Sequence, residues 1–239
     1  MMHSNSKERG MTFNAEMVRA ILSGQKTQTR RIVKNQREGD CWSVKPAEVQ
    51  LCARHTHDWW LPTGTKPYSS LPACHHGNVG DRIWVRETWG VVSHELDEDG
   101  RIQPWNPDRP ATAIQEMPFG NGYYSGHAIY AADGDFTWGD DDGYEDGRSC
   151  WKPSIHMPRA ASRILLEITG VRVERLNDIS EDDARSEGVM PKSLPAEKLV
   201  GGKLAFAELW ASIYGYENWQ ANPWVWVIEF KRVQEQSND

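Results

Sequence analysis

One short basic stretch carries the side chains best able to do chemistry. Residues 24–31 read GQKTQTRR and place Lys26, Thr29, Arg30 and Arg31 close together along the chain. A lysine with a lowered pKa can act as a base, a threonine hydroxyl can attack a carbonyl carbon, and adjacent arginines can hold an anion. The alternative is a basic surface turn without a ligand, and the stretch alone leaves both interpretations open.

The elements around this stretch decide whether its side chains can meet. Asn14 can cap a helix over residues 15–23, and Gly24 stands where a helix commonly ends. Residues 27–33 then alternate as a strand does. Because successive strand residues point to opposite faces, Lys26 and Thr29 converge only if Lys26 still belongs to the turn.

The remaining patterns predict a strand-rich chain with few helices. We expect a helix that begins after Ser180, with Asp183 in the reciprocal capping-box position, and ends at Gly188. Apolar residues at helical spacing predict a second helix over 206–214. A glycine break at Gly170, inside an alternating strand, is typical of a curved, barrel-like sheet. The other expected strands cover residues 11–13, 82–89, 128–130, 164–173 and 224–230.

Composition limits the class of protein. The 239 residues suggest one large or two small domains, and 12 Trp, 20 Gly and 13 Pro indicate long loops pinned by aromatic side chains. The net charge of -7 disfavours a surface that coats nucleic acid, so such binding would need a local basic patch. No apolar run approaches the roughly 20 residues of a membrane span. We therefore expect a soluble cytoplasmic protein that does not contact a membrane, with a disordered leader at 1–10 and a tail at 234–239.

Two segments could hold a metal ion. Residues 35–79 are rich in cysteine and histidine, but only Cys52 and His55 have the spacing of a zinc ligand pair. Residues 133–146 hold seven acidic side chains, without the glycine and closing glutamate of a calcium-binding loop. We expect free thiols, loop histidines and a solvated acidic loop, and neither a metal nor another cofactor.

Glu187 is the carboxylate that best fits a functional role. It would lie in the last turn of the helix ending at Gly188, where the helix dipole disfavours a negative charge by about 0.3–1 kcal/mol. Asp183, four residues earlier, adds repulsion between like charges. A cation across the site would offset this cost, and Lys26 is the candidate; otherwise Glu187 simply points to water.

The order of elements and four motifs resemble the ASCH domain family, whose fold is an α+β, PUA-like mixed β-barrel with flanking helices. The phage and prophage members are especially similar. The resemblance covers residues 11–34, 80–89 and 162–232, and implies a single domain over 11–233 with long loop insertions at about 35–79, 90–127 and 131–150. The motifs are residues 24–31, residues 80–85 (GDRIWV), the helix start at 179–187 and the closing strand at 225–230.

The resemblance also implies an activity. Small bacterial members are N4-acetylcytidine amidohydrolases that use a lysine and a threonine of a Gly-x-Lys-x-x-Thr turn and a glutamate of the helix after the long strand. Those roles fall on Lys26, Thr29 and Glu187. A phage-encoded member would act in the host cytoplasm. We expect the substrate, a modified nucleoside or RNA, to contact Arg30, Arg31, Arg86, Glu87, Trp89, Lys152 and His156.

Other members of the family bind RNA or are described as ribonucleases, so two alternatives remain open. In one, the chain is a non-catalytic RNA-binding module in which tryptophans stack on bases. In the other, the same basic turn serves a ribonuclease. Glu187 distinguishes hydrolysis from RNA binding, because hydrolysis by the family's arrangement needs this carboxylate and binding does not. The side chains that would track phosphates are Lys26, Arg30, Arg31, Lys34 and Arg37.

Overall fold

The computed structural model describes residues 6–39, 41–52, 54–138, 150–189 and 201–233. The chain divides into two compact units, each assembled from segments distant in sequence. Unit 1 comprises Met1–Lys7, Ser23–Arg82 and Glu167–Lys231, and unit 2 comprises Glu8–Leu22, Ile83–Leu166 and Arg232–Asp239. Each unit is described by itself below.

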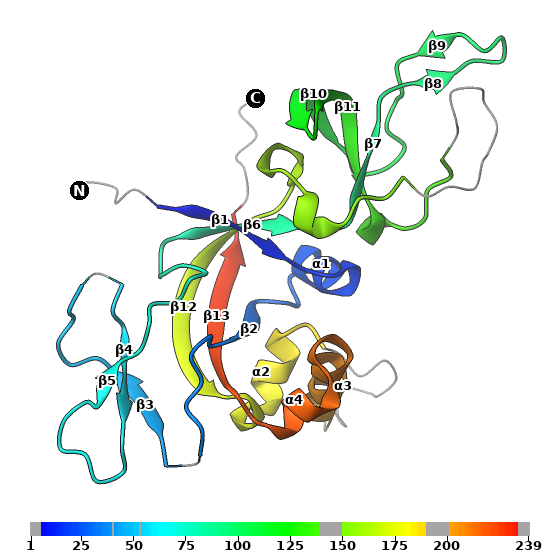
Figure 1. Ribbon diagram of the computed structural model, residues 1–239. Coiled ribbons are helices and arrows are strands. Elements are labelled where there is room, and N and C mark those ends of the chain that lie inside the picture. Colours follow the sequence, from blue (N-terminus) through cyan, green and yellow to red (C-terminus); the bar gives the residue numbers. More distant parts are fainter. Residues whose placement is uncertain (1–5, 40, 53, 139–149, 190–200, 234–239) are drawn as a thin grey trace. The chain divides into compact units, whose positions relative to one another are not determined.

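Unit 1 is built on three neighbouring strands (Figure 1). In the strand order β1-β6-β12-β13-β2 it holds the β12-β13-β2 part, formed by β12 (Leu165–Arg175), β13 (Trp224–Arg232) and β2 (Gln28–Ile32). The last two strands run antiparallel, with Thr29 opposite Ile228 and Arg30 opposite Val227. The helices are α2 (Glu181–Ser186), α3 (Gly202–Tyr214) and α4 (Tyr216–Gln220).

The two faces of this sheet meet different partners. On one face, Val225 and Val227 share a buried cluster with Phe206 and Trp210 of α3. On the other face, Trp224 packs edge-on against Trp59 with ring centroids 5.5 Å apart. Because paired residues of antiparallel strands share a face, β2 sends Arg30 toward the helices and Thr29 away from them.

The segment expected as an insertion at 35–79 contains a small antiparallel sheet in the order β3-β4-β5. Its strands are β3 (Ser43–Pro46), β4 (His57–Trp60) and β5 (Ser69–Ser70). All four residues of β4 are buried, so hydrophobic periodicity gives no alternating signal there. His57 and Trp59 are the side chains that reach Trp226 and Trp224 of β13.

Unit 2 contains β1 (Glu8–Thr12), α1 (Ala15–Leu22) and most of β6 (Arg82–Arg86). Its largest sheet is antiparallel in the order β10-β11-β7, with Tyr130 of β11 opposite Trp89 of β7. Both aromatic side chains are fully buried in the cluster that forms its core. The remaining strands of unit 2 are β7 (Trp89–Val92), β8 (Glu95–Leu96), β9 (Ile102–Gln103), β10 (Thr112–Phe119) and β11 (Gly122–Tyr130). Unit 2 also has single 3-10 turns at Ala131–Asp133, Ser154–His156 and Arg159–Ala161. A further 3-10 turn, at Leu176–Asp178, belongs to unit 1.

The expected α+β class is confirmed, but the sheets formed by the described residues are open and do not close into a barrel. The glycine break is wrong: β12 runs continuously through Gly170, which lies beside the carboxylate of Glu229. Strand β1 starts at Glu8, so residues 8–10 belong to a strand rather than to a leader. Within the described ranges, no helix has the length and apolar character needed to cross a membrane.

The expected single domain is a separate question from the two compact units. A division into two compact units does not by itself separate independently folding domains, since β12 runs from one unit into the other. The single domain over 11–233 therefore stays a prediction. The tail at 234–239, the first half of the leader and most of the acidic segment lie outside the described residues.

Candidate functional site

The basic stretch is held by a helix on one side and a strand on the other. Asn14 caps α1, since its side-chain oxygen accepts a hydrogen bond from the Met17 amide at 2.8 Å. Gly24 has a φ of 78°, a conformation that glycine adopts without strain. Lys26 already forms an antiparallel bridge, with Glu187, and the Thr27 amide donates to the Ser186 carbonyl at 2.8 Å. Extended backbone therefore begins at Lys26, and Lys26 is not part of the turn.

Lys26 and Glu187 form a buried ion pair. The Lys26 ammonium lies 2.6 Å from Oε2 of Glu187 and also donates to the Glu187 backbone carbonyl at 2.8 Å. Nη1 of Arg30 donates to the other carboxylate oxygen at 3.1 Å. The side chains of Lys26 and Glu187 are 0% and 2% exposed. The neighbouring Gln25 and Thr27 are exposed, so the pair lies directly beneath the surface.

Burial sets the protonation behaviour of Lys26. Desolvation is the largest influence and lowers the pKa of Lys26 from its usual 10.5, because a buried ammonium loses the water that stabilises its charge. The Glu187 carboxylate acts in the opposite direction, and Arg31 and Arg30 lower the pKa further. Lys26 can therefore give up its proton more readily than an exposed lysine.

The pair belongs to a larger ionic cluster on the helix face of the sheet. Arg30 joins its members, because it contacts Glu187, Glu174 at 2.5 Å and Asp183 at 3.5 Å. Arg172 extends the network, donating to Asp183 at 2.9 Å and to Glu229. Strands β2, β12 and β13 and helix α2 all contribute. We define the ionic cluster as Lys26, Arg30, Arg172, Glu174, Asp183, Glu187 and Glu229.

Asp183 shows how the cluster alters an ordinary helix start. Oγ of Ser180 accepts a hydrogen bond from the Asp183 amide at 3.0 Å, as a capping residue should. The Asp183 carboxylate binds Gln28 and Arg172. Burial acts to raise the pKa of Asp183, but the hydrogen bond from Gln28 and the charge of Arg172 outweigh it and lower the pKa. The carboxylate half of the expected capping box is thus engaged by the ionic cluster.

Thr29 lies on the other face of β2. Its hydroxyl is almost fully buried and accepts a hydrogen bond from Nη1 of Arg31 at 3.0 Å. Gln28 reaches Asp183 of α2, and Lys26 and Arg30 reach Glu187 at the C-cap of that helix. The structure therefore brings Lys26 and Glu187 together, while strand alternation gives Thr29 a different environment.

Basic and aromatic side chains gather on that second side. Burial is the largest influence that lowers the pKa of His75, and the charges of Lys34 and Arg31 lower it further, which indicates that these cations lie nearby. The Arg37 guanidinium lies 4.8 Å from the ring centre of Trp42 and 5.1 Å from that of Tyr68. Tyr68 is 57% exposed.

The remaining predicted substrate contacts belong to unit 2. Glu87 is buried, and Arg163 binds both of its carboxylate oxygens at 3.0 Å. Trp89 is fully buried, and the Lys152 ammonium lies 5.9 Å from its ring centre. Arg86 stacks over Trp84 at 4.5 Å, and His156 is exposed in a 3-10 turn. The substrate contacts expected of Glu87 and Trp89 would therefore need buried side chains to open.

In the cysteine- and histidine-rich segment, both ring nitrogens of His55 take part in hydrogen bonds. Nε2 of His55 lies 2.8 Å from Oδ1 of Asp58, and Nδ1 of His55 accepts from the Leu51 amide at 3.1 Å. In the part of the chain that the structure describes, no three His, Cys, Asp or Glu side chains are grouped as a metal site requires.

Sequence reasoning missed three of the seven residues of the ionic cluster. Arg172 and Glu174 stand two residues apart in an alternating strand, and Glu229 is the polar position on the face that carries Val225 and Val227. A charged residue on an otherwise apolar strand face is a usable signal, because a buried charge needs a partner. No sequence pattern shows which strands lie side by side, and hence which charged residues pair.

Comparisons with known proteins do not assign a family. No protein-family model, curated protein or solved structure matches the chain. The functional conclusion therefore depends on the geometry of the described residues and on the resemblance of its motifs.

Proposed function

We propose that the chain is an amidohydrolase that removes the acetyl group from N4-acetylcytidine or a related modified cytosine nucleoside, on a PUA-like fold of the ASCH type. One observation carries the proposal: the buried contact between Lys26 and Glu187, 2.6 Å apart, with the pKa of Lys26 lowered. Catalytic acids and bases commonly have pKa values shifted by burial and a charged neighbour.

The reaction needs a proton carrier at the amide. A nucleophile attacks the acetyl carbonyl carbon, the bond to N4 breaks, and N4 receives a proton, which gives the free cytosine amine and, after hydrolysis, acetate. In this proposal the Lys26–Glu187 pair protonates N4 as the bond breaks and, through an intervening water molecule, takes up the proton of the nucleophile. Arg30 keeps the Glu187 carboxylate oriented through its hydrogen bond at 3.1 Å.

Thr29 enters the proposal as the nucleophile on the resemblance alone. Arg31 donates to its hydroxyl at 3.0 Å, and a cation in that position favours the developing negative charge on the oxygen. Direct proton transfer to Lys26 is not supported, since Lys26 lies on the same side as Gln28 and Arg30, and Thr29 lies on the opposite face. A Thr29→Ala variant that keeps full activity would assign the attack to water and leave the Lys26–Glu187 pair as the active centre.

The decisive assay is incubation of the purified full chain with N4-acetylcytidine and chromatographic detection of cytidine and acetate. The expected result is release of the two products in equal amounts. The Glu187→Gln variant should release neither, and Asp133→Asn, which alters a carboxylate of unit 2 that binds Arg163 at 2.7 Å, should retain the activity. Full activity of Glu187→Gln would remove the pair from the mechanism.

A second function has its own supporting observation. The Arg37, Trp42 and Tyr68 contacts and the cations Arg31 and Lys34 combine positive charge with aromatic rings, as RNA-binding surfaces do. Lys26 and Arg30 do not contribute to this surface, because both are buried against carboxylates. If the chain is an RNA-binding module, Tyr68→Ala and Arg37→Ala should weaken RNA binding, while Glu187→Gln should leave it unchanged.

A further inference from the structure

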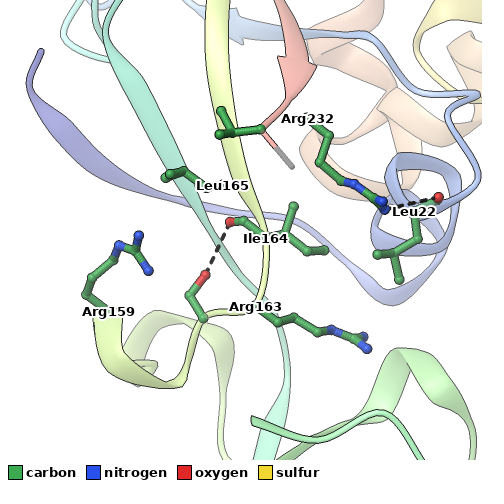
Figure 2. Close-up of a pocket in the computed structure, with 8 residues that line it drawn as sticks. Leu22, Arg159, Arg163, Ile164, Leu165 and Arg232 are labelled. Atoms are coloured by element: carbon green, nitrogen blue, oxygen red, sulfur yellow. Dashed lines mark hydrogen bonds between the residues drawn. The ribbon is translucent and has the colours of Figure 1, made fainter. Parts of the chain in front are cut away.

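Unit 2 contains a cavity of about 410 Å³ that the proposed amidohydrolase activity does not use. Small-molecule sites commonly have volumes of about 300–1,000 Å³. The cavity is lined by the end of α1, by the segment leading into β12 and by the end of β13, and Figure 2 shows these side chains arranged around Ile164. Its lining residues are Leu22, Arg159, Ser162, Arg163, Ile164, Leu165, Arg232 and Val233.

The lining is positively charged on one part and apolar on the other. Among the residues that the structure describes, the lining contains three arginines and no carboxylate side chain, although the whole chain has a net charge of -7. Leu22, Ile164, Leu165 and Val233 supply the apolar part. This combination suits a molecule with an anionic group on an organic body.

The three arginines differ in how firmly they are held. Arg163 is fixed, since it binds both oxygens of Glu87 and donates to Asp133 at 2.7 Å. Arg159 pairs with Glu8 at 2.9 Å, but the two side chains are 41% and 36% exposed. Such exposed pairs contribute little stability and exchange easily.

Arg232 is the side chain best placed to bind a ligand. It is exposed, and its Nη1 donates to the Leu22 carbonyl at 3.4 Å, as Figure 2 shows. A guanidinium carries five N–H donors in a planar fork, and among the described residues this hydrogen bond occupies one of them. The fork matches two oxygens of a phosphate group.

We propose that this cavity binds a phosphate monoester of a small organic molecule. Arg232 and Arg159 hold the phosphate, and the bond between Arg159 and Glu8 is exchanged for bonds to the ligand. Arg163 is already bound by Glu87 and Asp133, so it forms part of the cavity wall and is not counted as a phosphate ligand. The apolar side chains accept the organic body, because a phosphate alone would leave much of 410 Å³ unfilled. The inference does not depend on the amidohydrolase activity, which concerns residues of unit 1.

Binding is tested by isothermal titration calorimetry of the full chain with adenosine 5′-monophosphate, inorganic phosphate and adenosine. The expected result is saturable binding of the monophosphate, weaker binding of phosphate and none of adenosine. In the double variant Arg159→Ala/Arg232→Ala, the affinity for the monophosphate should fall about tenfold or more for each lost charge-assisted contact. Arg163 stays unchanged, because its removal would leave Glu87 buried without its partner.

The matched control removes two exposed cations elsewhere, in the double variant Lys66→Ala/Arg101→Ala. It should keep the wild-type affinity. An equal loss in the control would reduce the effect to overall charge and overturn the proposal. So would an absence of saturable binding to the wild type, or binding of a single-stranded RNA oligonucleotide but of neither phosphate ligand.

Discussion

Two buried glutamates, one in each unit, are held by cations in different ways. Glu187 contacts Lys26 and Arg30, whereas Glu87 is clamped by Arg163 through both oxygens. The two glutamates are 3% and 1% exposed, so burial alone does not distinguish them. The distinction lies in the cation, because a lysine can lose its proton in a protein and an arginine cannot.

Burial shifts a pKa in each unit, upward for a carboxylate and downward for an ammonium. Desolvation raises the pKa of Glu87, although its hydrogen bonds to Arg163 act in the opposite direction. In unit 1, the pKa of Lys26 is lowered mainly by burial, so Lys26 can release its proton more readily than an exposed lysine. The comparison teaches that a buried carboxylate indicates proton transfer only when its partner can also titrate.

The largest expected effect separates the two carboxylates by activity. With N4-acetylcytidine as substrate, Glu187→Gln should lower kcat by about 10²–10⁴-fold, the usual contribution of a positioned acid or base. The control Asp133→Asn changes the surroundings of Arg163 and Glu87 and should leave kcat unchanged. Steady-state kinetics on both variants, with circular dichroism to verify folding, checks the prediction. Equal losses of kcat in the two variants would show that Glu187 does not differ in role from the carboxylates of unit 2.

The next effect concerns stability. Arg163→Met should lower the free energy of unfolding by about 3–5 kcal/mol, because Glu87 and Asp133 lose a partner in a poorly solvated site. Arg101→Met, whose exposed pair with Asp99 is 73% and 70% accessible, should change it by less than about 1 kcal/mol. Urea denaturation measures both. The double variant Arg163→Met/Glu87→Gln should lose less free energy of unfolding than the two single variants lose together. Strictly additive losses would contradict the direct bonds between Arg163 and Glu87.

The smallest effect is a pair of opposite pH dependences. The pKa of Lys26 is lowered in the folded state, so the unfolded chain binds more protons between that value and 10.5, and stability rises with pH there. The pKa of Glu87 is raised, so the folded chain binds more protons just above 4.5, and stability falls as pH rises there. Denaturation at a series of pH values should show the first slope flattened in Lys26→Met and the second in Glu87→Gln. A Lys26→Met variant with the wild-type alkaline slope would show that Lys26 does not titrate in this range.

The sequence predicts local elements well where local chemistry decides them. The cap at Asn14, the helix ends at Gly24 and Gly215, and the closing strand after Pro223 all depend on neighbouring residues. The strands within residues 35–79 were not predicted. Strand β4 is buried on both faces, so its sequence shows no alternation of apolar and polar residues.

The candidate site was predictable only in part. The contact between Lys26 and Glu187 follows from a carboxylate at a helix end that needs a cation. The placement of Thr29 does not follow, because it depends on where extended backbone begins. The bridge between Lys26 and Glu187 settles that point, and it is a contact between residues far apart in sequence.

The alternation in β2 has a consequence for how the chain reaches a unique fold. A slip of one residue against β13 would carry Thr29 and Arg31 into the carboxylates of the ionic cluster. The same slip would push Lys26 and Arg30 against the tryptophan side of the sheet, away from every acidic partner described here. Unpaired buried charges are among the costliest errors a sheet can contain. The ionic cluster thus selects one strand register during folding and rejects its nearest competitor.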